Sequence, residues 1–242
     1  MNVVGVIVCW LSAGVSSFIA GYLMKDEIDK YIYIDIKDQE EDTLRFIKDC
    51  EKLFNKKVEI LKSEYETVEN AILAAGVITM RSGFAPCTSY LKKRVRKQWE
   101  DKHKGEDITY VWGMDVTEKH RADRLITSMP DYKHRFPLIE NHITKESSHA
   151  ILQELGIKRP RMYELGYRNN NCVGCVKGGM GYWNKIRVDF PEVFKRRAEL
   201  ERKIGASILK ECYLDELAAD RGNNKEVIPE CDIFCMFQTK EF

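Results

Sequence analysis

The chain has 242 residues, of which 44% are hydrophobic and 32% charged, with only 15 Gly and 6 Pro. This composition is typical of a globular protein with its own core and excludes a disordered, collagenous or disulfide-stapled small protein. The 39 basic side chains nearly cancel the 38 acidic ones, so the formal net charge of +1 excludes a general polyanion-binding field. The longest apolar run, residues 3–11, is too short to span a bilayer and follows no basic signal-peptide segment, so we expect a cytoplasmic protein without a membrane partner.

Strand and helix signals alternate along the first 140 residues. The continuous apolar run at 3–10 predicts a central strand buried on both faces, and a helix is expected at 16–24. The sequence then predicts a strand at 31–36, a helix at 42–54, a strand at 58–61, helices at 68–75 and 89–102, and strands at 108–114 and 137–139. This alternation predicts an α/β fold with a parallel sheet and helices on both faces.

The pattern changes near residue 145, after which no strand is expected. Short helices are predicted near 146–155 and 160–165, a loop rich in Gly, Asn and Cys at 166–181, and a charged helix from Pro191 onward. We therefore expect residues 1–140 to form a nucleotide-binding type of α/β core and residues 141–242 to form a helical, cysteine-bearing extension packed on it.

The loop at 12–17 (SAGVSS) carries the first chemical signal, because it lies between a buried strand and a helix start. Gly14 would let a phosphate approach the outward-pointing backbone N–H groups, and Ser12, Ser16 and Ser17 could add hydroxyl donors. The spacing fits neither the dinucleotide-binding nor the Walker motif. A serine helix cap with a turn glycine is the structural alternative.

Several segments resemble one known family. SAGVSSFIAGYL after a strand resembles the PP-loop (SGGxDS) of the adenine nucleotide alpha hydrolase superfamily, which includes ATP pyrophosphatases and phosphoadenosine phosphosulfate (PAPS) reductases. DQEEDTLRFIKDCEKLF, PCTSYLKKRVRKQW, VWGMDVTEKHRADRL and NNNCVGCVKGGMGYWNKIRVDFPEVF resemble segments of PAPS reductase-like proteins, including small phage-encoded ones. The resemblance covers most of the chain and implies a Rossmann-like (HUP-type) core that binds ATP or PAPS and serves sulfur chemistry.

Two positions depart from the family pattern. Ala13 replaces the second-position Gly, and Ser16 replaces the Asp that the family's ATP pyrophosphatases use in Mg²⁺-ATP chemistry. The second change argues against cleavage between the α and β phosphates, although PAPS reductases, which bind an adenylyl sulfate without hydrolysing ATP, also vary at this position.

The cysteines form the second chemical signal. In Cys172-Val173-Gly174-Cys175, a tight turn would let two thiolates reach one metal ion. The resemblance adds Cys87, at the start of a basic helix, as a ligand of an iron-sulfur cluster, with Cys231 or Cys235 as the fourth. The alternatives are a zinc site made by Cys172, Cys175, Cys231 and Cys235, and a redox-active cysteine pair.

Further site residues follow from position and resemblance. Glu118 and Arg121 lie past the fourth strand, where they could meet an anion held by the 12–17 loop, and Arg121 resembles the family's anion-contacting arginine. Their spacing also fits a helix-surface ion pair. Asp38 is a candidate ribose contact and Lys177 a further anion contact. Cys231 follows Glu230, as in the nucleophilic tail of PAPS reductases, but without the Gly and His that normally follow.

Three functions are expected, in this order: ATP-dependent, pyrophosphate-releasing sulfur transfer assisted by an iron-sulfur cluster, PAPS or APS reduction that releases sulfite, and a non-catalytic adenine-nucleotide module with structural zinc. A thiolating enzyme would need a nucleic-acid acceptor, for which the basic runs at 92–97 and 195–197 are candidates; their alternative role is a solvated helix face. A homodimer is left open.

Overall fold

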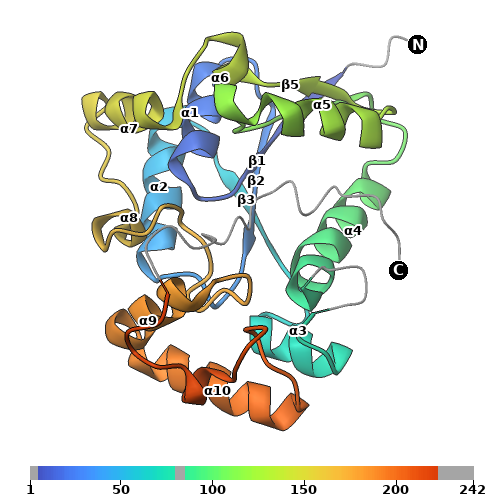
Figure 1. Cartoon of the computed structure of the whole chain (residues 1–242). Coiled ribbons are helices and arrows are strands. Elements are labelled where there is room, and N and C mark those ends of the chain that lie inside the picture. Colours follow the sequence, from blue (N-terminus) through green and yellow to red (C-terminus); the bar gives the residue numbers. More distant parts are fainter. Residues whose placement is uncertain (1–4, 80–84, 223–242) are drawn as a thin grey trace.

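The computed structural model describes residues 5–79 and 85–222 as an α/β protein built on one five-stranded, all-parallel sheet (Figure 1). The strands are β1 (Val6–Leu11), β2 (Lys30–Asp35), β3 (Val58–Lys62), β4 (Ile108–Val111) and β5 (Lys133–Arg135). Their order across the sheet is β3-β2-β1-β4-β5. The chain thus builds outward from β1 to β3, then crosses to the other side of β1 for β4 and β5.

Alternating side chains explain why the sheet is buried on both faces. Val8 and Trp10 of β1 pack in one hydrophobic cluster, and Cys9 and Leu11 pack in another on the opposite face. Strands β2 and β4 alternate in the same way between the two clusters. The apolar run at the N-terminus therefore forms the central strand, as its sequence predicts.

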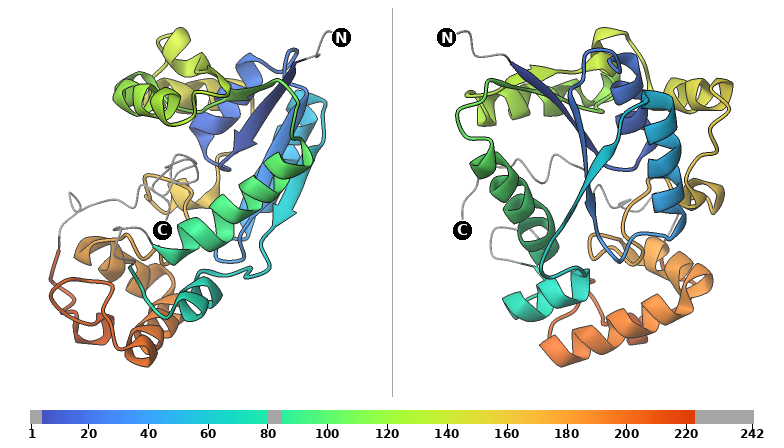
Figure 2. Two further views of the ribbon diagram at one scale, coloured as in Figure 1. Left: turned by 90° about the vertical axis from the view of Figure 1, so that its right-hand side faces the viewer. Right: turned by 180° about the vertical axis from the view of Figure 1, so that it is seen from behind.

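Helices cover both faces of the sheet (Figures 1 and 2). The cluster on one face contains side chains from α1 (Val15–Leu23), α2 (Asp42–Phe54), α6 (Pro137–Glu140), α7 (Lys145–Glu154) and α8 (Arg161–Glu164). The cluster on the other face contains side chains from α3 (Val68–Ala75), η1 (Thr88–Lys93), α4 (Arg94–Lys102) and α5 (Lys119–Ser128). The 3-10 turn η2 (Val116–Glu118) directly precedes α5. Residues 145–163 thus pack with the α/β core.

A third, smaller cluster joins the remaining elements below the sheet in Figure 1. It is formed by α9 (Met180–Asp189), α10 (Pro191–Ile204) and η3 (Leu214–Glu216), with Trp183 fully buried at its centre. In the described part of the chain, no helix has the length and apolar character needed to cross a bilayer.

The structure corrects the expected elements at several places. The strand expected at 137–139 is wrong: Pro137 begins α6, as proline favours at a first helical position, and the polar residues of β5 precede it. The helix expected at 89–102 begins as the π-helix η1 and continues as α4. Helices α5 and α9 are additions to the elements that the sequence predicts.

Candidate functional site

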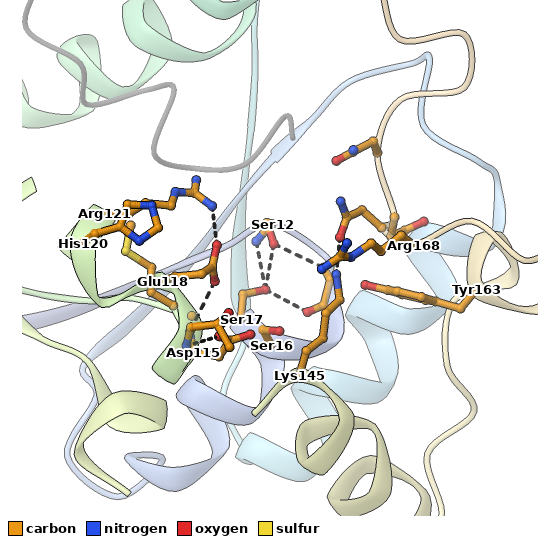
Figure 3. A pocket seen from close by; sticks show the side chains of 17 residues that line it. Ser12, Ser16, Ser17, Asp115, Glu118, His120, Arg121, Lys145, Tyr163 and Arg168 are labelled. Atoms are coloured by element: carbon orange, nitrogen blue, oxygen red, sulfur yellow. Dashed lines mark hydrogen bonds and ion pairs between the residues drawn. The ribbon is translucent and has the colours of Figure 1, made fainter. Parts of the chain in front are cut away.

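A cavity of about 260 Å³ opens at the carboxyl ends of β1 and β4 (Figure 3). This is the point where the sheet order reverses, and in open parallel sheets ligands bind in the crevice at such a switch point. Residues from two parts of the fold line it. The segments at 12–17 and 113–121, which follow β1 and β4, form what we call the strand wall. We call the opposite set, Lys145, Tyr163 and residues 168–171, the helix wall.

Serine hydroxyls build the first loop of the strand wall. The Ser12 N–H donates to Ser17 Oγ at 3.1 Å, and the Ser12 hydroxyl donates to the same oxygen at 3.0 Å. Ser17 Oγ in turn donates to the Gly14 carbonyl at 2.9 Å, and Ser12 Oγ accepts from the Gly14 N–H at 3.3 Å. The hydroxyls of Ser12 and Ser17, expected as phosphate donors, therefore hold the turn itself.

The first turn of α1 presents two backbone N–H groups to the cavity. The Val15 N–H donates to the Tyr163 hydroxyl at 3.3 Å, and the Phe18 N–H donates to the Gly14 carbonyl at 3.2 Å. The N–H groups of Ser16 and Ser17 have no acceptor among residues 5–79 and 85–222. Both residues line the cavity, so these two amides are the candidates for the predicted anion cradle.

Ala13 has a left-handed backbone, with φ of 58°. This conformation costs a residue with a Cβ roughly 1–2 kcal/mol, which explains why glycine suits this position of the resembling motif. Asn170 stabilises it from the helix wall, because its side-chain amide donates to the Ala13 carbonyl at 2.9 Å. Asn170 and Tyr163 together join segments far apart in the chain, since their bonds to the 12–17 loop span 157 and 148 residues.

Gly113 brings the two halves of the strand wall together. A Cβ at this position would lie 2.5 Å from Ser17 Cα and 2.6 Å from Ser17 N, distances that no side chain tolerates without moving the backbone. The end of β4 therefore lies directly against the start of α1.

Glu118 and Arg121 lie in the strand wall, at the position that the sequence predicts. They form an ion pair, and Glu118 Oε2 also accepts from the Asp115 N–H at 3.2 Å. Asp115 Oδ1 accepts from the Thr117 N–H at 2.8 Å and from its hydroxyl at 2.6 Å. The structure thus shows the expected position in the cavity lining and the local ion pair, and contact of Arg121 with an anion stays a prediction.

The helix wall contains cations that sequence reasoning missed. Lys145, the first residue of α7, is half-buried and donates to the side-chain oxygen of Asn169. Burial and the nearby Arg168 guanidinium lower the pKa of Lys145. Arg168 makes no hydrogen bond or ion pair with any described residue. Figure 3 shows both side chains across the cavity from Arg121, with the serines between them.

Asp38 and Lys177 do not line the cavity. The buried Asp38 carboxylate forms an ion pair with Arg197 and accepts from the Val68 N–H at 2.6 Å. Arg197 is 1% exposed and also donates to the Gly174 carbonyl at 3.3 Å. The 195–197 run therefore does not present three cations to a nucleic acid, because Arg197 is an internal support of the cysteine turn.

The turn carrying Cys172 and Cys175 is well supported. Gly174 has φ of 70°, and the Tyr182 hydroxyl accepts from the Cys175 N–H at 2.9 Å. Both thiols are buried, as is Cys87, which directly precedes η1. Asn170 and Asn171, just before this turn, line the cavity.

The described cysteines do not by themselves form a metal centre. Among residues 5–79 and 85–222, no group of three or more His, Cys, Asp or Glu side chains is arranged to hold a metal ion. Cys231 and Cys235, the candidates for the fourth ligand, lie outside the described residues. The prediction that Cys231 is a nucleophile concerns the same segment. The iron-sulfur cluster and its zinc alternative stay predictions.

Comparison with known proteins adds no family. No protein-family model matches the chain, and a search of curated proteins gives no significant match.

Proposed function

We propose that the chain binds an adenine nucleotide through its phosphoryl or sulfuryl oxygens in this cavity, and that its core is a Rossmann-like, HUP-type PP-loop fold. The observation that carries the proposal is the pair of N–H groups at Ser16 and Ser17, which have no acceptor within the described part of the chain and lie at the switch point of the sheet. The charges support it, because three cations and two carboxylates line the cavity (Arg121, Lys145, Arg168, Asp115 and Glu118).

ATP-dependent sulfur transfer is the first candidate reaction. An acceptor oxygen attacks the α phosphorus, the bond to the β-phosphate oxygen breaks, and pyrophosphate leaves with that electron pair. A hydrosulfide or thiolate donor would then attack the activated acceptor carbon, and AMP would leave with the electron pair of the broken carbon–oxygen bond. The amides of Ser16 and Ser17 would hold non-bridging oxygens, and Arg121 would offset the charge that develops on the transferred group. These roles need only groups that the structure brings to one cavity.

Reduction of PAPS or APS is the second candidate, and the state of the carboxylates favours it. A Mg²⁺-nucleotide site usually offers carboxylate ligands, whereas Glu118 pairs with Arg121 and Asp115 accepts two bonds from Thr117. Ser16 stands where the resembling ATP-using motif has its Asp. Both carboxylates of the described lining are thus engaged in local contacts, whereas Arg168 makes no hydrogen bond or ion pair with any described residue.

Calorimetric titration with ATP, PAPS and adenosine tests the proposal. We expect ATP or PAPS to bind and adenosine to bind much more weakly. Ser16→Glu would place a carboxylate against the two amides and should abolish binding, whereas Gln98→Glu adds the same charge on the exposed face of α4 and should leave it unchanged. Equal binding to wild type and Ser16→Glu contradicts the proposal.

Product analysis then separates the two reactions. Release of pyrophosphate or AMP from ATP with Mg²⁺ supports sulfur transfer, and release of sulfite from PAPS with a thiol donor supports reduction. Sulfite release without any turnover of ATP would make reduction the first candidate and sulfur transfer the second.

A further inference from the structure

Trp112 and Gly113 connect the sheet to the first turn of α1. Trp112 directly follows β4 and is fully buried, and its backbone N–H donates to the Arg135 carbonyl of β5 at 3.0 Å. Gly113 comes next, and a Cβ there would lie 2.5 Å from Ser17 Cα. The position of Trp112 relative to β5 therefore influences how the end of β4 meets the Ser16 and Ser17 amides.

His134 of β5 holds the side chain of Trp112. The Trp112 Nε1–H donates to His134 Nδ1 at 3.1 Å, and His134 Nε2 lies 3.0 Å from the Met129 carbonyl oxygen. An indole nitrogen can only donate and a carbonyl oxygen can only accept. The two contacts therefore require a neutral imidazole with its one proton on Nε2, and they engage both ring nitrogens.

A second proton on His134 is incompatible with this arrangement. It would bind at Nδ1, where it would face the Trp112 Nε1–H, and two donors cannot form a hydrogen bond with each other. Burial lowers the pKa of His134, and the contact with the Met129 carbonyl opposes this effect. The neutral form is therefore favoured near neutral pH, and acid is needed to break the contact with Trp112.

Aromatic rings surround His134. The ring centroids of Trp112, Phe136 and Tyr110 lie 6.0, 6.3 and 6.5 Å from its own. The titratable groups on this side are Tyr110 and Tyr132, whose ring centroids are 5.0 Å apart. Burial raises the pKa of both hydroxyls, so neither ionises in neutral or mildly acidic solution.

The charged groups of the neighbouring elements do not act on His134. Helix α5 packs on this face with its apolar Ala122 and Leu125. Charged side chains of α4, β5 and the segments beside them form ion pairs with one another, namely Arg96–Glu100, Lys133–Asp107 and Arg135–Glu140. Among the described residues, no charged side chain changes the pKa of His134. Protonation of its own ring is therefore the change in charge that mild acid brings to the contact with Trp112.

We propose that His134 is a positioning residue: its neutral ring holds the end of β4 against the first turn of α1, and its protonation in mild acid loosens that turn and weakens anion binding at Ser16 and Ser17. The inference rests on the proposed function for the identity of the ligand. The coupling between His134 and the two amides requires no ligand, so it can be measured separately.

NMR titration of the ligand-free wild type tests this coupling directly. At neutral pH we expect the His134 ring to carry its proton on Nε2 alone. As His134 gains its second proton, the amide resonances of Gly113, Ser16 and Ser17 should shift with the same midpoint. Amide resonances that do not follow the midpoint of His134 would overturn the inference.

His134→Asn is the matched variant, because its side-chain oxygen can still accept from Trp112 but does not titrate. The amide shifts should disappear in this variant and persist in His142→Asn, which removes an exposed histidine that does not line the cavity. His120 does line the cavity, so only shifts that are lost in His134→Asn are assigned to His134. Thermal unfolding checks that both variants are folded, and if His134→Asn does not fold, the wild-type titration alone decides.

Nucleotide affinity gives the functional readout. ATP and PAPS binding is compared at about pH 7.5 and about pH 5.5, on either side of the ordinary histidine pKa. Because apparent affinity falls with the binding-competent fraction, the wild type and His142→Asn should lose about threefold or more affinity at the acidic pH relative to His134→Asn. An equal change in all three proteins overturns the inference, while binding itself still supports the proposed function. If none of the proteins binds a nucleotide, the proposed function fails and the ligand-free titration decides the inference.

Discussion

The two walls of the cavity differ in how they are built. The strand wall is local: its loops directly follow β1 and β4, and Gly113 presses one against the other. The helix wall is assembled by tertiary contacts, through the bonds that Tyr163 and Asn170 make to the 12–17 loop. The position of the Ser16 and Ser17 amides is therefore determined by a short motif, whereas the position of the groups that face them depends on the packing of distant segments.

The largest expected effect comes from breaking the buried ion pair that supports the cysteine turn, which follows the helix-wall residues 168–171 in the chain. Asp38→Ala leaves the Arg197 guanidinium buried without its carboxylate, close to the cysteine turn. Loss of one partner of a buried ion pair typically costs about 3–5 kcal/mol. We expect urea unfolding to show a decrease of this size in the free energy of unfolding.

A surface ion pair supplies the matched control for Asp38. Lys133 and Asp107 lie 2.6 Å apart with side chains 67% and 40% exposed, so Lys133→Ala should cost about 1 kcal/mol or less. If Asp38→Ala costs no more than Lys133→Ala, the buried pair does not stabilise the fold more than a surface pair does.

The second effect concerns the strand wall. Gly113→Ala would force a Cβ to within 2.6 Å of Ser17 N, and such overpacking costs about 1–3 kcal/mol. Because the shift falls on the Ser16 and Ser17 amides, we expect nucleotide affinity to fall together with stability. Gly5→Ala is the control, since its nearest neighbour would be 3.4 Å away, and both properties should stay unchanged there. If Gly113→Ala binds the nucleotide with wild-type affinity, the geometry of the Ser16 and Ser17 amides is not needed for nucleotide binding.

The smallest expected effect is a pH dependence that arises in the helix wall. An anion favours protonated Lys145, whose pKa is lowered by burial and by Arg168, so ADP affinity should fall as pH rises through that lowered pKa. Arginine stays charged over this range, so Lys145→Arg should flatten the alkaline decline by a few-fold in affinity. The charged and titratable groups that face Lys145 are Arg168, Glu118, Asp115, Glu146 and His149. An identical pH dependence of ADP affinity in the wild type and in Lys145→Arg would show that Lys145 does not contact the ligand.

The strand wall is largely predictable from sequence, for a physical reason. Buried parallel strands have continuous apolar runs, and their carboxyl ends meet at one edge, so Ser16 and Arg121 can be placed together without coordinates. The edge strand β5 escapes prediction because its residues Lys133–Arg135 are polar and few, while the apolar run after them forms α6.

The helix wall cannot be predicted in this way. Lys145 follows a capping Thr144, which is the pattern of an ordinary surface helix, and Arg168 lies in an irregular loop. Asp38 illustrates the converse error, because its position after β2 suggests a ribose contact, whereas its partner Arg197 is 159 residues away. Only the folded chain shows which charges meet.

The central claim is that the backbone amides of Ser16 and Ser17 bind the anionic part of a nucleotide. Backbone amide NMR shifts during titration with ATP or PAPS test it most directly. We predict that the Ser16 and Ser17 amide protons shift the most, and that AMP shifts them more than adenosine does. Saturable binding that leaves both of these resonances unchanged would contradict it.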